Sequence, residues 1–307
     1  MPASETTGSP AAATRAFAGI EWLRFAACFG IVAFHQDGPS QQVGHAGLPA
    51  FAMLTTALSA RAARNRAWAT FRTERLRRLL LPWLYWSAFY AVVQCVLATL
   101  EQRPLWARFE PEMLVVGTYP HLWFLPFAAV AALFAGRCAA QLRAGHWLVL
   151  GAAAIPFAGW LLTLALPFAV RNWVFVLPAA LLGIALAATP PGTGASNGAF
   201  RVALAGAAGS AAAWLVGRDG LSIEYTIATP AVALAWALPL RAGRTTTRLG
   251  GATLGIYVLH PFVAMLAALL AIEAGVPFTP LSLLLAVFAG SLLITLALRA
   301  SPRSAAV

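Results

Sequence analysis

The chain has 307 residues, of which 60% are hydrophobic and 10% are charged, and its mean hydropathy is +0.76. This composition excludes an ordinary water-soluble domain and is typical of a protein that lies in a lipid bilayer. All 21 basic residues are arginine, and 10 acidic residues leave a net charge of +11. Because the arginines form short clusters between apolar runs, we interpret the charge as a topology signal and exclude nucleic acid as a partner.

Ten apolar runs follow a first segment, residues 1–16, whose Ala, Thr, Ser and Pro content predicts a disordered tail. A membrane-spanning helix needs about 20 mostly apolar residues. The sequence therefore predicts an all-α, polytopic membrane protein with about ten transmembrane helices, in a single membrane domain over residues 17–300 with a C-terminal tail at 301–307. The predicted spans are Phe17–Gln36, Ala46–Ala60, Leu79–Leu100, His121–Gly136, Trp147–Leu166, Asn172–Ala188, Arg201–Val216, Tyr225–Leu240, Gly250–Ile272 and Leu281–Leu298.

The distribution of arginine predicts the orientation of these spans. Residues 61–78 contain seven arginines and the single acidic residue Glu74, and residues 241–248 add three more arginines. Cytoplasmic loops of membrane proteins are enriched in basic residues. Both segments are therefore expected on the cytoplasmic side, and alternation of ten spans places the N-terminus there as well.

The first span contains polar side chains that need a reason to be in a membrane. A charged group near the centre of a span costs about 2.5–3.5 kcal/mol on insertion scales, so Arg24 is expected to face the protein interior, with Glu21 one turn earlier as its partner. His35 follows eleven residues after Arg24, on the same helix face and about 16 Å further along the axis. The two residues are predicted to serve different ends of one cavity or pathway. The alternative is a packing ion pair and a histidine ring in the headgroup zone.

The third span is preceded by a basic cluster. Arg75 and Arg78 are one helical turn apart and could bind a phosphate group bidentately. The alternative interpretation of such a cluster is a topology signal or a contact with lipid headgroups.

Histidines occur in two further spans. His121 opens the fourth span on the same side as His35, and paired imidazoles could handle a proton because histidine titrates near neutral pH. Trp123 next to it is typical of an aromatic interface belt. In the ninth span, Tyr257 and His260 are three residues apart, and His260 lies near mid-membrane, where it needs a hydrogen-bond partner or a functional role. The histidines are dispersed without a carboxylate cluster, which predicts no metal site.

Together these segments resemble the integral-membrane acyltransferase family 3, which includes bacterial O-acetyltransferases of surface polysaccharides and relatives of fucose acetylase. Four motifs carry the resemblance in order along the chain. The chain departs from the family in the second span, where Phe51–Ser59 replaces a Phe-rich stretch that ends in Ser-Gly. The motifs are the acidic-x-x-Arg…His signature of Glu21, Arg24 and His35, the Arg-x-x-Arg pair of Arg75 and Arg78, His-Leu-Trp-Phe-Leu at His121–Leu125, and Gly-Ile-Tyr-x-x-His at Gly255–His260.

The resemblance implies ten helices in the cytoplasmic (inner) membrane of a bacterium and transfer of an acyl group, commonly acetyl from acetyl-CoA, to a hydroxyl of a sugar or glycoconjugate. It implies acyl-CoA as donor substrate, a carbohydrate acceptor and membrane lipid as partners, and no permanently bound cofactor. His35 would be the general base, Arg24 would polarise the thioester or hold pantetheine, and His121 would orient His35 or the acceptor. The expected substrate-binding residues are Arg75, Arg78, Glu21, Trp123, Tyr257 and His260.

Three alternatives stay open from the sequence. Transfer could be direct or pass through an acyl-histidine. A transporter or flippase of a lipid-linked or acylated metabolite would use Arg24, His35 and His260 to line a polar pathway. A scaffold without turnover would tolerate loss of His35.

Overall fold

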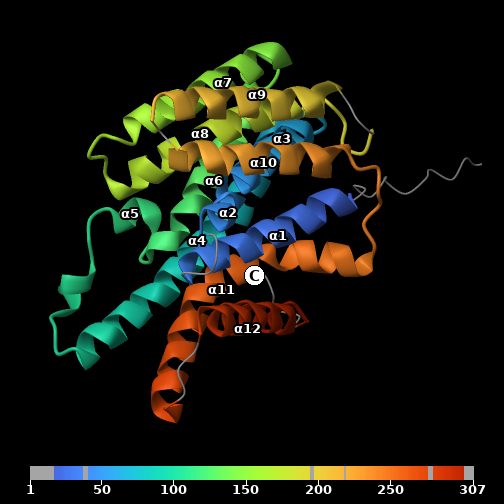
Figure 1. Cartoon of the computed structure of the whole chain (residues 1–307). Coiled ribbons are helices and arrows are strands. Elements are labelled where there is room, and N and C mark those ends of the chain that lie inside the picture. The colour runs from blue at the N-terminus through green and yellow to red at the C-terminus, as the bar shows by residue number, and fades with distance from the viewer. Residues whose placement is uncertain (1–16, 37–40, 194–196, 218, 276–278, 301–307) are drawn as a thin grey trace, which may run out of the picture.

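The computed structural model describes residues 17–36, 41–193, 197–217, 219–275 and 279–300, so the tails expected at 1–16 and 301–307 lie outside it. Every regular element in these residues is a helix (Figure 1). The α-helices are α1 (Ala18–His35), α2 (Gln41–His45), α3 (Gly47–Arg64), α4 (Trp68–Leu100), α5 (Met113–Val116), α6 (Phe124–Cys138), α7 (Ala144–Leu161), α8 (Phe168–Leu186), α9 (Asn197–Leu215), α10 (Asp219–Ala237), α11 (Arg244–Ala274) and α12 (Pro280–Ala300), with short 3-10 helices η1 (Leu105–Arg108) and η2 (Pro120–Trp123).

Eight helical segments among the described residues are long and apolar enough to cross a membrane: α1, α4, α6 with η2, α7, α8, α9, α11 and α12. The predicted second and eighth spans correspond to α3 and α10, which do not meet this criterion although they have 18 and 19 residues. Both pack against several other helices, so protein replaces lipid around much of their surface. The structure confirms an all-α, polytopic membrane protein.

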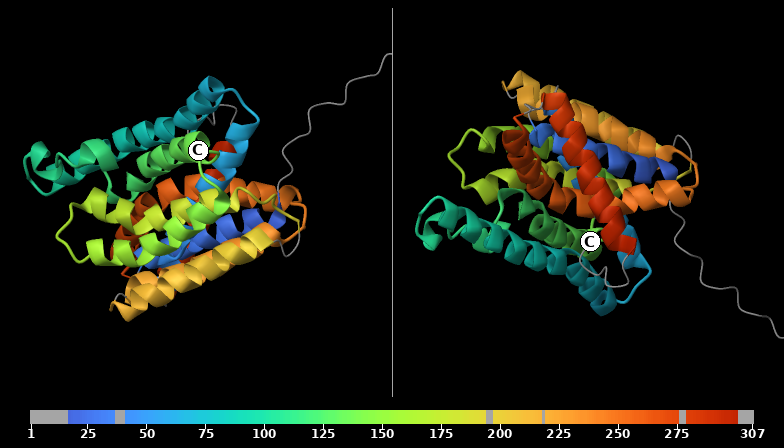
Figure 2. Two further views of the ribbon diagram at one scale, coloured as in Figure 1. Left: turned by 90° about the horizontal axis from the view of Figure 1, so that it is seen from above. Right: turned by 90° about the horizontal axis from the view of Figure 1, so that it is seen from below.

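The helices form two connected groups. In Figure 1, α7, α8, α9 and α10 lie together on one side, and α3 links them to α6 and α1. On the other side α1 packs against α11, which α12 crosses, and α4 lies at the edge of the bundle beside α6 (Figure 2). Close approach depends on small residues: a Cβ atom at Gly183 of α8 would lie 2.1 Å from the hydroxyl oxygen of Thr56 in α3.

Backbone and side-chain contacts bring the arginine-rich segments together. Ala18 at the start of α1 donates its N–H to Leu240 O at 2.9 Å, just before α11. Arg61 at the end of α3 donates to Ala187 O at 3.3 Å, just after α8. Arg75 and Arg78 line one cavity together with Thr247, so residues 61–78 and 241–248 lie at one end of the bundle, which we call the arginine-rich end.

Candidate functional site

A cavity of about 490 Å³ lies at the arginine-rich end, between α1, α3, α4, α6 and α11. Its polar lining includes five of the residues singled out in the sequence, and most of the rest is apolar. The five are Glu21, Arg24, Arg75, Arg78 and Tyr257. Phe124 and Leu125 of the His-Leu-Trp-Phe-Leu motif also line it, so all four motifs of the sequence meet at one cavity.

Arg24 is held in the cavity wall by two contacts. Its Nη1 lies 3.0 Å from Glu21 Oε2, and its Nη2 donates to Thr253 Oγ1 at 3.4 Å. The Thr253 hydroxyl in turn donates to Gly250 O at 2.9 Å. Glycine is needed at position 250, because a Cβ there would lie 1.9 Å from the Glu21 carboxylate. The ion pair predicted from the i, i+3 spacing is present, and it faces the cavity.

Arg75 and Arg78 bring positive charge to the cavity without a compensating carboxylate. Neither forms an ion pair with any described residue, and nearby Glu74 pairs with Arg66. The Arg75 guanidinium lies over the Phe71 ring, 5.4 Å from its centroid, and its buried Nε has no hydrogen-bond partner among the described residues. Unpaired guanidinium groups on a cavity wall favour an anionic ligand, phosphate above all.

Three histidines gather beyond the cavity, and we call His35, His121 and His260 the histidine cluster. The ring centroid of His260 lies 5.2 Å from that of His35 and 5.4 Å from that of His121. The three residues come from α1, η2 and α11. Sequence reasoning placed His35 and His121 on one side of the membrane, and the structure adds His260 between them.

The position of His260 follows from the proline after it. Pro261 has no N–H and leaves the carbonyl of Tyr257 without its helical partner. His260 Nδ1 lies 2.7 Å from that oxygen. Because a carbonyl only accepts, Nδ1 carries the proton, and Nε2 is left as an acceptor. Nε2 is buried without a partner in the described part of the chain.

Tyr257 connects the cavity to the histidine cluster. Its ring lines the cavity, and its hydroxyl donates to the backbone carbonyl of His121. The His121 ring is 4% exposed, lies beside Tyr90 and Tyr119, and has no hydrogen-bond partner on either nitrogen among the residues described. A buried polar ring without partners is costly and points to a functional role.

Arg24 and His35 occupy the two ends of this arrangement. Arg24 lines the cavity, whereas His35 is the last residue of α1, is exposed, and contacts His260 within the histidine cluster. Arg24 therefore faces the cavity and His35 faces His260, so both side chains point toward the candidate site. Trp123 is placed differently from the expectation of a substrate contact: it is buried against Phe124 and Phe127 and does not line the cavity.

Sequence reasoning missed the wall that α3 contributes. The residues of this wall follow Phe51 at intervals of three, four, seven and eight positions, which is the spacing of one helix face. That spacing could have identified the wall. The buried hydroxyl of Ser59 has no partner among the described residues. This wall is the segment in which the chain departs from the family pattern, and it consists of Phe51, Leu54, Thr55, Leu58 and Ser59.

A second missed feature is the pair of His45 and Glu224. His45 Nδ1 contacts a carboxylate oxygen of Glu224, which is buried in α10. The His45 ring is stacked between Phe34, with centroids 4.3 Å apart, and Phe175, at 4.5 Å. No local pattern joins two residues 179 positions apart. The pair lies outside the cavity lining.

The chain was compared with models of known protein families. The model of the acyltransferase family 3 domain, described as an acyltransferase domain, matches residues 17–300. No curated protein and no solved structure matched the chain.

Proposed function

Since the chain belongs to acyltransferase family 3 and is an acyltransferase of the membrane, we propose that it moves an acetyl group from acetyl-CoA to a hydroxyl group of a sugar or glycoconjugate. The observation that carries this proposal is the cavity with unpaired guanidinium groups, whose wall residue Tyr257 also holds the histidine cluster. The cavity suits an anionic donor, and the cluster supplies bases.

The donor enters from the arginine-rich end. Its phosphates bind Arg75 and Arg78, and its pantetheine arm lies along the wall of α3 and Arg24. Polar contacts to the arm are stronger there than in bulk water because the wall is mostly apolar. Eleven helical steps separate Arg24 and His35 by roughly 16 Å along the axis. Arg24 therefore holds pantetheine polar groups, and the thioester lies further on, near the histidines.

Transfer takes place at the histidine cluster. Neutral His35 accepts the proton of the acceptor hydroxyl while the hydroxyl oxygen forms a bond to the thioester carbonyl carbon. The carbon–sulfur bond then breaks, and the proton passes from His35 to the leaving thiolate, which gives CoA and the acetyl ester. His260, fixed through Nδ1, and His121 position His35 and the acceptor.

By the positive-inside rule, the arginine-rich end faces the cytoplasm, where acetyl-CoA is made. The resemblance to bacterial O-acetyltransferases supports the cytoplasmic membrane of a bacterium as the location. His35 then lies toward the opposite side. The acceptor reaches it from there, together with any lipid that anchors the acceptor in the membrane.

The proposal is tested with the purified chain in lipid nanodiscs, radiolabelled acetyl-CoA and a panel of sugar acceptors. We expect label in an acceptor and one thiol released for each ester formed. A parallel experiment in liposomes without CoA measures movement of the acceptor across the bilayer. Movement without CoA, combined with no labelled acceptor, would overturn the proposal in favour of a carrier.

Arg24→Lys tests the role of the guanidinium. Lysine keeps the charge but loses the planar fork that contacts both Glu21 and Thr253. We expect kcat/KM for acetyl-CoA to fall by at least about tenfold, equivalent to ~1.4 kcal/mol. Arg77→Lys is the matched control, because Arg77 is exposed and lies outside the cavity lining. Equal kinetics of the two variants would show that Arg24 acts only through its charge.

A further inference from the structure

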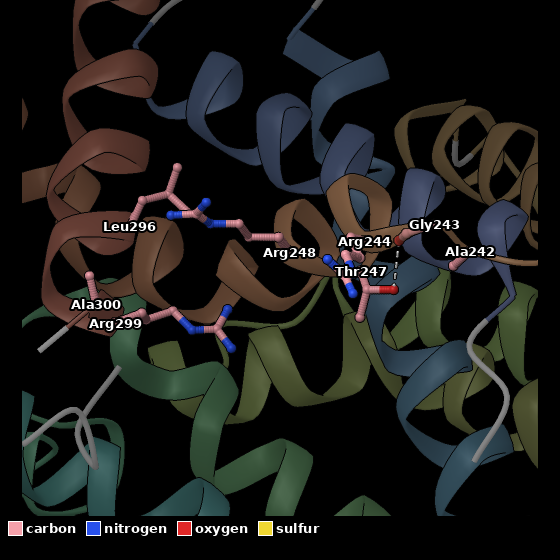
Figure 3. A pocket seen from close by; sticks show the side chains of 8 residues that line it. All are labelled: Ala242, Gly243, Arg244, Thr247, Arg248, Leu296, Arg299 and Ala300. Carbon is pink, nitrogen blue, oxygen red and sulfur yellow. Dashed lines mark hydrogen bonds between the residues drawn. The ribbon is translucent and has the colours of Figure 1, made fainter. Parts of the chain in front are cut away.

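A second pocket of about 610 Å³ opens beside the first at the arginine-rich end. It lies between the start of α11 and the end of α12 (Figure 3). Its lining contains no acidic residue, and it consists of Ala242, Gly243, Arg244, Thr247, Arg248, Leu296, Arg299 and Ala300.

Two arginines reach across this pocket from opposite walls. Figure 3 shows Arg248 extending from α11 toward α12 and Arg299 extending from α12 toward α11. Gly251 makes room for the second of them, since a Cβ atom there would lie 2.6 Å from Nη1 of Arg299. None of the pocket arginines forms an ion pair with a residue in the described ranges. Forked donors without a carboxylate are suited to the oxygens of a phosphate group.

The pocket and the cavity are neighbours, because Thr247 lines both. Together they place unpaired guanidinium groups in two sets: Arg75 and Arg78 at the cavity, and the three pocket arginines beyond Thr247. A ligand with two separated phosphate positions would match this arrangement.

We infer that the pocket of Arg244, Arg248 and Arg299 binds the 3′-phosphate on the ribose of the CoA donor. This inference rests on the proposed function. Along CoA the order is thiol, pantetheine, diphosphate and 3′-phosphorylated adenosine. With pantetheine beside Arg24 and the diphosphate at Arg75 and Arg78, the ribose phosphate is the part that extends outward past Thr247. The same phosphate chemistry occurs in lipid headgroups, so the experiment separates the two sources.

The kinetic experiment compares acetyl-CoA with acetyl-3′-dephospho-CoA. For the wild-type chain we expect the KM to be about tenfold higher for the dephospho donor, because charge-assisted hydrogen bonds are lost. In Arg248→Gln and Arg299→Gln, the KM for acetyl-CoA should rise by a similar factor and the preference between donors should disappear. Arg75→Gln should raise the KM for both donors and keep their ratio. An unchanged ratio in both pocket variants would overturn the inference.

The matched control is Arg201→Gln, since Arg201 is exposed and lines neither pocket nor cavity. The same assays are run in nanodiscs of neutral phosphatidylcholine and in nanodiscs that contain phosphatidylglycerol. If the pocket held a lipid phosphate, the wild type would use both donors equally, and the pocket variants would lose only their response to anionic lipid. That result would also overturn the inference.

A binding measurement separates this inference from the proposed function. Adenosine 3′,5′-bisphosphate and adenosine 5′-phosphate are titrated into the protein by calorimetry, with no acceptor and no turnover. We expect the wild type to bind the bisphosphate about tenfold more tightly than adenosine 5′-phosphate. Arg299→Gln should bind the two nucleotides with equal affinity. Selective binding without acetyl transfer would contradict the proposed function alone. Transfer without any preference for the 3′-phosphate would contradict the pocket alone.

Discussion

The helical hydrogen bonds are interrupted beside Pro178 in α8 and at Pro261 in α11, and a different side chain fills each break. Next to Pro178 in α8, the hydroxyl of Tyr225 donates to Phe175 O at 2.7 Å and accepts from the N–H of Ala179 at 3.1 Å. Next to Pro261 in α11, His260 donates from one ring nitrogen and leaves the other buried and unpartnered among the described residues.

We infer that the interruption in α8 matters for folding alone, whereas the interruption in α11 prepares a side chain for catalysis. Tyr225 uses its hydroxyl as both donor and acceptor, so it has little capacity left to act on a substrate. His260 satisfies one freed carbonyl and keeps an acceptor nitrogen beside His35 and His121. A buried polar group without a partner is costly and is retained where it has a function. We therefore expect substitutions at the break in α11 to lower turnover and substitutions at the break in α8 to lower stability.

The largest effect is expected for His35→Ala. This change removes the proposed base beside His260, and general base catalysis typically contributes about 10²–10⁴-fold. Transfer should fall by that factor, while insertion and the melting temperature in detergent stay unchanged because the side chain is exposed. His146→Ala, at an exposed position of α7, should retain full activity. Near-wild-type turnover by His35→Ala would remove the catalytic role from this histidine.

The second-largest loss of turnover is expected for His260→Gln. Glutamine is polar but does not reproduce the ring that bonds Tyr257 O on one side and lies against His35 on the other. We expect kcat to fall by at least about tenfold, equivalent to ~1.4 kcal/mol, with a smaller change in the KM for acetyl-CoA. Steady-state kinetics over both substrates separate the two constants. A change in melting temperature with unaltered kcat would make His260 a packing residue like Tyr225.

Pro261→Ala tests whether the proline itself prepares His260. Alanine supplies an N–H for Tyr257 O, which then competes with His260 Nδ1 for the same carbonyl. Turnover should decrease severalfold, less than in His260→Gln, because the ring is retained and loses only its orientation. The matched change Pro178→Ala in α8 should leave turnover unchanged. Equal turnover by both proline variants would show that the break in α11 has no special role.

Local patterns account for the parts of this site that lie on one helix. The i, i+3 spacing predicted the Glu21–Arg24 pair, and eleven helical steps relate Arg24 to His35 without knowledge of other helices. Hydropathy located α4 and α11 but began them at Leu79 and Gly250, whereas the helices begin at Trp68 and Arg244. Hydropathy detects only the apolar part of a helix. The backbone hydrogen bonds of α4 and α11 begin earlier, in the polar turns that carry the arginines.

Contacts between distant helices could not be predicted in this way. Thr253 as a partner of Arg24 depends on how α1 packs against α11, and the sequence holds no local signal for it. The stacking of His45 between Phe34 and Phe175 likewise depends on three separate helices. The packing of α3 and α10 against several other helices likewise cannot be read from their composition.

The smallest effect on turnover is expected for Tyr225→Phe, which tests whether the break in α8 affects stability alone. Without the hydroxyl, Phe175 O and the N–H of Ala179 lose their shared partner in a fully buried place, at a cost of about 1–3 kcal/mol. The melting temperature should therefore fall, while kcat per folded molecule stays at the wild-type value because Tyr225 lies outside the cavity lining. Tyr85→Phe on the exposed face of α4 is the control and should change neither quantity. If Tyr225→Phe instead lost turnover at an unchanged melting temperature, the hydroxyl in α8 would belong to the chemistry, and the distinction between the two prolines would fail.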